Sequence, residues 1–220
     1  PAIMLREILV SVPKTASVAD DGAAMQKAAE VRQKALGGES FEQLAADEQR
    51  TRLGEIDVLQ PTLFALQVAL AALWRSWGVE PDAVVGHSMG EAAAAYVAGA
   101  LTLEDATAVI CARSRLLKRL SGRGGMAVVG LCGEEAERLL AGKERELSIA
   151  ASNSPTATVV SGDTAALADL VAGLDRSGIY CSLIKVDVAS HSPQTVPLAA
   201  ELRPCLAALR PHQPSVPFVS

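Results

Sequence analysis

The sequence predicts an α/β fold in which a second, smaller unit is inserted into the first. From Val84 on, short apolar runs alternate with helical patterns, which is typical of a sheet covered by helices. Between residues 126 and 187 a separate order of strand, helix, strand, strand, helix and strand appears. Half of the 220 residues are apolar, so the chain can bury a sizeable core.

The first 50 residues form a segment of uncertain origin. Residues 5–12 (LREILVSV) predict a strand, and residues 23–36 and 41–46 predict two amphipathic helices around Gly37 and Gly38. We find no catalytic constellation in this segment.

The larger unit is expected to comprise residues 51–125 and 188–220. Residues 63–77 predict a buried helix, with Gln60-Pro61 in its first turn and Gly78 at its end. Residues 83–85 predict a strand, which is followed by an alanine-rich helix at 91–100 and a longer helix at 103–120. The chain opens with Pro1 and ends in an apolar, strand-like run, so we expect both ends to be cuts through a longer polypeptide.

The smaller unit, residues 126–187, is expected to be ferredoxin-like because of its element order. Its predicted strands are 126–131, 147–152, 157–163 and 180–188, and its predicted helices are 134–142 and 164–178. Asp163 is a candidate cap for the second helix, and residues 122–125, with three glycines, are a candidate hinge.

Residues 84–91 read VVGHSMGE and contain the pattern G-x-S-x-G. In a strand–turn–helix setting this pattern forms a nucleophile elbow, as in α/β-hydrolase-like folds, and it exposes the serine on a strained turn. Small residues are expected at Gly86 and Gly90, because a side chain there would collide with the following helix. Ser88 is therefore the candidate nucleophile of a truncated, α/β-hydrolase-like large subdomain.

A serine nucleophile needs a base, and the chain has three histidines. His87 adjoins Ser88 and is expected to point elsewhere, while His212 lies in a proline-flanked segment. His191 follows an apolar run and is the candidate base, with a purely structural role as the alternative. The backbone N–H of Met89 is a candidate oxyanion donor. The only acid after His191 is Glu201, which we place on a solvated helix face.

Arg113 lies in the middle of an apolar segment (DATAVICARSRLL), 25 residues after Ser88. If it is buried, it needs an anionic partner, and a carboxylate held by both guanidinium nitrogens would satisfy it. The alternative is a surface arginine like its neighbours Arg115 and Lys118.

The composition argues against several classes of partner. A net charge of −5 and a pI near 5.3 give no footprint for nucleic acid or an anionic membrane. No apolar run reaches the roughly 18 residues needed to span a bilayer, although residues 63–77 come closest. The four cysteines have no metal-site spacing, so we expect no metal site, and we expect them to be small buried residues of a cytoplasmic protein.

With these residues in hand, residues 52–220 resemble the acyltransferase domain of modular type I polyketide synthases, relatives of the malonyl-CoA:acyl carrier protein transacylases. The resemblance rests on the segment IDVLQP, the GHSMGE elbow with the helix AAAAYVAGALTLEDA after it, and the segments GGMAVVG, ASNSPTATVVSGD and VDVASHSP. Residues 1–49 more weakly resemble part of a parvulin-type peptidyl-prolyl isomerase. The alternative for them is a diverged acyltransferase N-terminus or a linker.

The resemblance implies a role for each matching residue. Ser88 is the acylated nucleophile, His191 its base, and Arg113 the group that binds the free carboxylate of a malonyl-type unit. The remaining implied site residues form the acyl pocket and oxyanion region: Gln60, His87, Met89, Asn153, Val188 and Ser190. The implied substrate is a CoA thioester and no cofactor is bound. The implied acceptor is the phosphopantetheine thiol of an acyl carrier protein, and ketosynthase and linker domains are implied neighbours.

The sequence leaves the acyl unit and the reaction class open. Residues 188–191 read VASH, and the resemblance associates a small residue before the histidine with methylmalonyl rather than malonyl. Methylmalonyl is therefore the favoured unit. The alternatives to an acyltransferase are a serine hydrolase or thioesterase that shares the elbow, or a catalytically inactive fragment.

Overall fold

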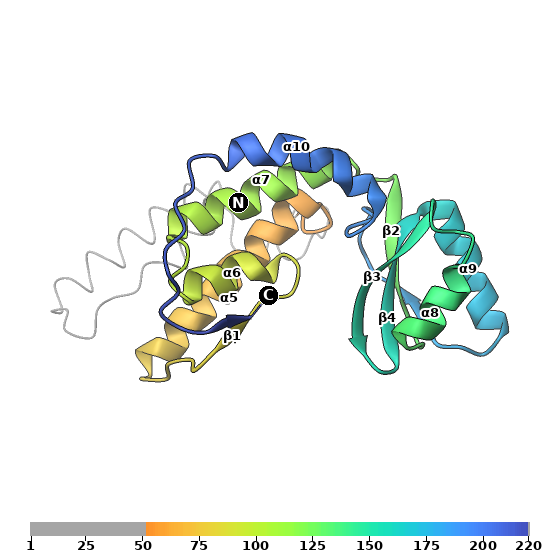
Figure 1. Ribbon diagram of the computed structural model, residues 1–220, viewed down its shortest axis with the longest axis horizontal. Coiled ribbons are helices and arrows are strands. Elements are labelled where there is room, and N and C mark those ends of the chain that lie inside the picture. The colour runs from red at the N-terminus through yellow and green to blue at the C-terminus, as the bar shows by residue number, and fades with distance from the viewer. Residues whose placement is uncertain (1–51, 220) are drawn as a thin grey trace, which may run out of the picture. The chain divides into compact units, whose positions relative to one another are not determined.

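The structure is a computed structural model that describes residues 52–219 (Figure 1). The chain divides into two compact units within helix α7 (Leu103–Lys118). Unit one ends at Ser114 and resumes at Ala208, and unit two is Arg115–Ala207. Unit two thus encloses the small subdomain expected at 126–187 and extends beyond it at both ends. The strand and helices expected before residue 50 lie outside the described residues.

Unit one contains helices α5 (Ile56–Ser76) and α6 (Gly90–Val97) and most of α7. Strands β1 (Val84–Val85) and β6 (Phe218–Val219) pair in parallel. Helix α5 packs against α6, and α6 contacts β1. The buried core of this unit is made by three helices and consists of Phe64, Ala65, Val68, Ala92, Ala93, Ala106 and Ile110.

Helix α5 begins earlier than the sequence predicted. Its first turn is at Ile56, and Pro61 lies inside the helix rather than in its first turn. The N–H groups of Val58 and Leu59 already donate to the Glu55 carbonyl, which starts the helix before the proline. Gly78 ends the helix with φ 83°, as predicted, because this conformation strains residues with a side chain.

Helix α5 is also 21 residues long and apolar enough to cross a membrane by length and composition alone. The sequence predicted a shorter apolar stretch, residues 63–77, because it placed Pro61 in the first turn of the helix. A third of its most apolar window is buried inside the protein. Phe64 and Val68 pack in the core of unit one, as in the core helix of a folded domain.

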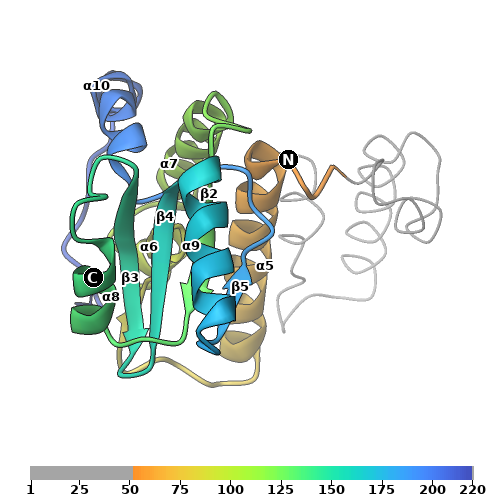
Figure 2. The same ribbon diagram turned by 90° about the vertical axis from the view of Figure 1, so that its right-hand side faces the viewer.

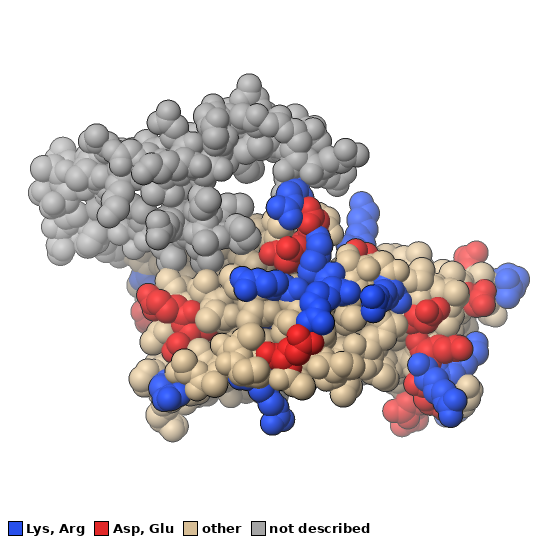
Figure 3. Space-filling model, turned by 90° about the horizontal axis from the view of Figure 1, so that it is seen from above, with Lys and Arg blue, Asp and Glu red and all other residues tan. Residues whose placement is uncertain are grey.

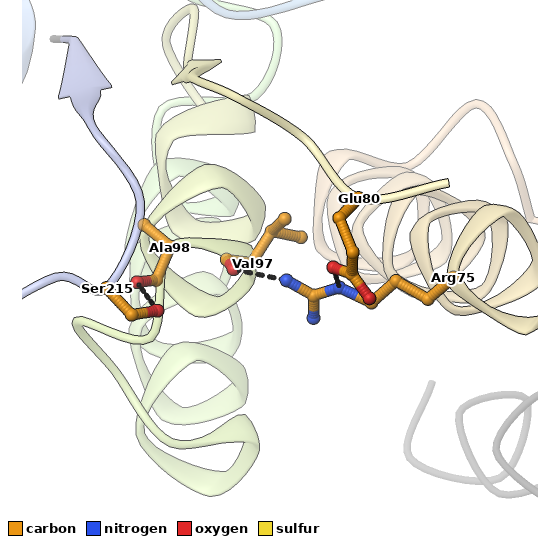
Figure 4. A network of polar contacts seen from close by, with 5 residues as sticks. All are labelled: Arg75, Glu80, Val97, Ala98 and Ser215. Atoms are coloured by element: carbon orange, nitrogen blue, oxygen red, sulfur yellow. Dashed lines mark hydrogen bonds and ion pairs between the residues drawn. The ribbon is translucent and has the colours of Figure 1, made fainter. Parts of the chain in front are cut away.

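Polar contacts tie the ends of these helices together (Figure 4). Arg75, at the end of α5, pairs with Glu80 at 3.0 Å and donates to the Val97 carbonyl at 2.9 Å. Ser215 donates to the Ala98 carbonyl through both its backbone N–H and its hydroxyl. These contacts fix the C-terminal end of α6 and so help to hold the elbow at its other end.

Unit two is a four-stranded antiparallel sheet in the order β3-β4-β2-β5 (Figure 2). Its helices α8 and α9 lie on one face of the sheet and cover an apolar core. The strands are β2 (Gly124–Val129), β3 (Leu147–Ser154), β4 (Ala157–Asp163) and β5 (Cys181–Leu183), and the helices are α8 (Gly133–Leu140) and α9 (Thr164–Arg176). This is the ferredoxin-like order that the sequence predicted.

Asp163 caps helix α9, as the sequence predicted, by accepting from the N–H groups of Ala165 and Ala166. Strand β5 ends at Leu183, so the predicted strand at 180–188 is too long. Its last five residues leave the sheet and lead, through residues 188–191, into the short 3-10 helix Pro193–Thr195 and helix α10 (Val196–Cys205).

The cysteines are less buried than predicted. Cys205 is exposed on α10, and the other three are half-buried. Cys132 is the N-cap of α8, where its backbone N–H donates to Glu135 at 3.0 Å. Cys132 therefore serves as the N-cap residue of a helix rather than as a residue that fills the core.

Candidate active site

The segment GHSMG forms a sharp turn between β1 and α6 in unit one. Ser88 has φ 55°, a left-handed conformation that costs on the order of 1 kcal/mol for a residue with a side chain. The N–H groups of Gly90 and Glu91 donate to the carbonyls of His87 and Ser88, at 3.0 and 3.2 Å, so the turn winds directly into the helix. This strand–turn–helix setting is the one that the nucleophile-elbow pattern requires.

The two glycines of the elbow are not equivalent. A Cβ at Gly86 would lie 2.4 Å from the Cα of Glu91, a distance that no side chain can adopt without moving the helix. A Cβ at Gly90 would meet only the Gln67 side chain, at an ordinary 3.7 Å. The expectation of a steric need for glycine is thus met at Gly86 and is wrong for Gly90.

Arg113 lies beside the elbow. From α7, its Nη1 group donates to Gln60 Oε1 at 2.6 Å and its Nη2 group donates to Ser88 Oγ at 3.3 Å. Gln60 itself is 7% exposed and belongs to α5. Helices α5 and α7 and the turn before α6 therefore bring the glutamine, the arginine and the serine together.

The electrostatics of Arg113 are unusual for an arginine. Burial lowers the pKa of its guanidinium from the ordinary value, although an arginine stays protonated at neutral pH. Among residues 52–219 it forms no ion pair with a carboxylate. A half-buried cation that is paired only with neutral groups is a ready binding site for an anion. The contacts of Arg113 with Gln60 and Ser88 favour this interpretation over that of a surface arginine.

His87 and Met89 flank the serine. Met89 is the N-cap of α6, and its side chain packs against the core of unit one. His87 is exposed and lines a hollow of about 590 Å³ with residues of α5, β1 and α6. His87 therefore faces an open space in unit one, and Met89 contributes both packing and a helix N-terminus.

His191 lies in unit two, in the loop between β5 and α10. It is exposed and has φ 60°. Among residues 52–219 the non-glycine residues with positive φ are Arg52, Ser88 and His191. Two of the three are the sequence's candidate nucleophile and base, and such backbone strain tends to concentrate at functional sites. Because the two residues belong to different units, the Ser88–His191 pair stays a prediction.

The other site residues predicted in unit two differ in exposure. Val188 is fully buried and Ser190 is 8% exposed, so neither presents much surface in this structure. Asn153 is exposed near the end of strand β3. Their predicted place in an acyl pocket stays a prediction.

A second hollow, of about 480 Å³, lies within unit two between the end of α7 and α10. Arg119 and Glu201 line it and pair with each other at 2.5 Å. Glu201 is exposed, as the sequence predicted. In Figure 3 a group of basic side chains lies at the centre of the face drawn, with acidic side chains next to it. No cluster of metal-ligating side chains occurs within residues 52–219.

A comparison with protein families decides the class of this chain. The model described as "Acyl transferase domain" matches residues 15–220. The chain belongs to the acyl transferase domain family. The match begins inside the segment that lies outside the described residues, and the parvulin-like interpretation of that segment stays a prediction.

Relatives of this acyl transferase domain come from polyketide synthases. The chain is 53% identical over 166 residues to the spectinabilin polyketide synthase system protein NorA' of Streptomyces orinoci, which is 75% of this chain and 5% of NorA'. The acyltransferase domain from module 8 of the salinomycin polyketide synthase matches with a TM-score of 0.74 at 43% identity, covering 76% of this chain and 40% of that one. For a loading acyltransferase of the avermectin synthase the TM-score is 0.75, at 43% identity, covering 76% and 54%. These matches confirm the predicted resemblance and fold class.

Sequence reasoning missed two residues of this acyl transferase domain. It placed Gln60 near the acyl pocket but not as the hydrogen-bond partner of Arg113. It also passed over Ser192, which caps the 3-10 helix after His191. A serine directly before a proline is a common start of a helical turn and was the available signal. The contact between Gln60 and Arg113 joins residues 53 positions apart, which local patterns do not predict.

Proposed function

We propose that this acyl transferase domain moves a malonyl-type acyl group from CoA to the phosphopantetheine thiol of an acyl carrier protein, through an ester on Ser88. The observation that carries the proposal is the contact between Arg113 and Ser88, at 3.3 Å, with Gln60 holding the other guanidinium nitrogen. A nucleophile beside a half-buried cation favours acyl groups that carry their own carboxylate.

The reaction takes two half-steps. Ser88 Oγ attacks the thioester carbonyl while its proton moves to the ring of His191, and the carbon–sulfur bond breaks as His191 returns the proton to the CoA sulfur. The carrier thiol then attacks the Ser88 ester, with its proton passing through His191 to Oγ. The N–H of Met89, at the start of α6, is the proposed oxyanion donor. CoA and phosphopantetheine enter as substrates, and no bound cofactor is needed.

The proposed acyl unit is methylmalonyl, favoured over malonyl. The support is the small side chain of Ser190, which directly precedes His191. Ser190 is 8% exposed. One methyl group changes the binding free energy by roughly 1–3 kcal/mol, so other pocket residues also weigh on this choice. Val188, Asn153 and His87 keep their proposed places around the pocket.

The proposed partners follow from the relatives. The chain spans about 5% of the length of NorA', a polyketide synthase protein, and 40% of the salinomycin acyltransferase structure. We infer that an acyl carrier protein and ketosynthase and linker domains of one synthase surround this domain in the cytoplasm. Nucleic acid and membrane are not among the proposed partners.

The experiment that tests the proposal separates transfer from hydrolysis. The chain is loaded with radiolabelled methylmalonyl-CoA, excess CoA thioester is removed, and carrier protein with or without its phosphopantetheine arm is added. Transfer of the label to the armed carrier alone supports an acyltransferase. Release of free methylmalonate at the same rate with either carrier supports the thioesterase alternative, and no loading at all supports the inactive fragment.

A further inference from the structure

Ser192 directly follows the proposed base and is 5% exposed in unit two. Its hydroxyl donates to the Ala189 carbonyl at 2.7 Å, and the same oxygen accepts from the Gln194 backbone N–H at 3.3 Å. One side chain thus bridges the residues on both sides of His191. A buried hydroxyl with two such bonds fixes the turn more strongly than either bond alone.

Hydrogen bonds also fix the chain on the C-terminal side of His191. The Ser192 carbonyl accepts from the N–H and the hydroxyl of Thr195, at 3.0 and 2.8 Å. Ala189 is fully buried against β2, where a Cβ at Gly124 would lie 2.6 Å from the Ala189 Cβ. The backbone that enters and leaves the histidine is therefore anchored before and after it.

His191 itself is strained. At φ 60° its backbone is in the left-handed region, which a free chain rarely adopts at histidine. Its side chain is exposed while Ala189, Ser190 and Ser192 around it are buried. His191 is thus an exposed residue in a strained conformation among buried neighbours, where the bonds of Ser192 are placed to oppose its relaxation.

We propose that Ser192 is a positioning residue for His191: its hydroxyl bridge between Ala189 and Gln194 holds the histidine in the left-handed conformation that presents its ring for proton transfer. This inference rests on the proposed role of His191 as the base. Ser192 touches no reacting atom and acts only through the backbone of its neighbour.

A double-mutant cycle on the full 220-residue chain tests the proposal, with the rate of Ser88 acylation by methylmalonyl-CoA followed by intact mass. We expect Ser192→Ala to lower the rate about tenfold, because a buried hydrogen-bond bridge is lost. In a chain that already carries His191→Ala, Ser192→Ala is expected to cause no further fall in the acylation rate. An unchanged rate in the single variant, or an equal loss in both backgrounds, would overturn the proposal.

The histidine resonances give a second readout that does not need turnover. The chain has three histidines, so the His191 ring signals are assigned by their loss in His191→Ala. In Ser192→Ala they are expected to shift or broaden while those of His212 stay in place, and unchanged His191 signals would contradict the proposal. If His191→Ala loads at the normal rate, the proposed base is wrong, and these signals still decide whether Ser192 positions the ring.

Ser177→Ala is the matched control. Ser177 also donates to a backbone carbonyl of unit two, that of Gly173 at 3.0 Å, but it is an exposed residue at the end of α9. It is expected to leave both readouts unchanged. Should Ser192→Ala fail to fold, Ser192→Cys keeps the side-chain size and weakens both bonds, with the same expected direction of effect.

Discussion

Arg113 Nη2 lies 3.3 Å from Ser88 Oγ, although the two residues are 25 positions apart, one in helix α7 and the other in the turn before α6. The arginine is half-buried, and Gln60 is its other hydrogen-bond partner. A cation in this setting gains more from a carboxylate than from neutral acceptors, because charge-assisted bonds are about twice as strong. The contact thus links the position of the nucleophile to the proposed choice of acyl group.

Replacing Arg113 should change which acyl groups are loaded. We expect Arg113→Ala to lower loading of malonyl-type groups by on the order of 10²–10³, since a buried charge pair loses one partner. Loading of propionyl from its CoA thioester should be unchanged or raised. Mass spectrometry of the acylated protein measures both, and an equal fall for the two thioesters would show that Arg113 serves the fold rather than the carboxylate.

Gln60 offers a more selective change at the same place. In Gln60→Glu a carboxylate replaces the amide that accepts from Arg113 at 2.6 Å. This internal anion should compete with the substrate and lower methylmalonyl loading by about tenfold, with a smaller effect on propionyl. Gln60→Met, which supplies no anion, is the size-matched comparison. Equal loading by the two variants would contradict this competition.

The two elbow glycines make a matched pair. Gly86→Ala places a methyl group 2.4 Å from the Glu91 backbone, so we expect a clear loss of stability or of Ser88 loading. Gly90→Ala meets only Gln67, at 3.7 Å, and adds a better helix former at the start of α6. Thermal unfolding should show Gly90→Ala at least as stable as the parent. A larger loss of stability for Gly90→Ala than for Gly86→Ala would contradict the steric difference between the two glycines.

The stability of unit two should depend on pH through Glu135, which caps the start of helix α8. The backbone N–H of Cys132 holds the pKa of Glu135 below its usual range. A carboxyl with a lowered folded pKa adds stability above its unfolded pKa and loses it as the pH falls through the folded value. Glu135→Gln should therefore weaken the pH dependence of unfolding below about pH 5. Urea unfolding at pH 7 and pH 4 checks this, and an unchanged pH dependence would exclude the cap as its source.

Local patterns predicted much of this fold. The alternation of apolar runs with helical patterns predicted the ferredoxin-like unit. Residue type and position predicted Asp163 as a helix cap and Gly78 as a helix end. Each of these features depends on residues that are close in sequence. Pro61 was misplaced since the true start of α5 depends on Glu55, six residues earlier. The end of β5 was also missed, because Val188 is buried in the loop that follows the strand and does not pair in the sheet.

The candidate site was predicted in part for the same reason. The G-x-S-x-G pattern is local, so it marked Ser88 and the turn around it. The sequence left Arg113 open between a surface residue and a carboxylate clamp, and only the approach of α5 and α7 to the elbow shows that it is half-buried beside Gln60. The left-handed backbone of His191 and the hydrogen bonds of Ser192 beside it are not encoded in any local residue pattern.

The most direct test of the account is a competition for Ser88. The chain is incubated with equal amounts of methylmalonyl-CoA and propionyl-CoA, which differ by the carboxylate that Arg113 is proposed to bind, and the intact protein is weighed and mapped by peptides. The account predicts one acyl adduct, located on Ser88, that is mainly methylmalonyl and is absent in Ser88→Ala. A preference for propionyl, or an adduct that persists in Ser88→Ala, would contradict it.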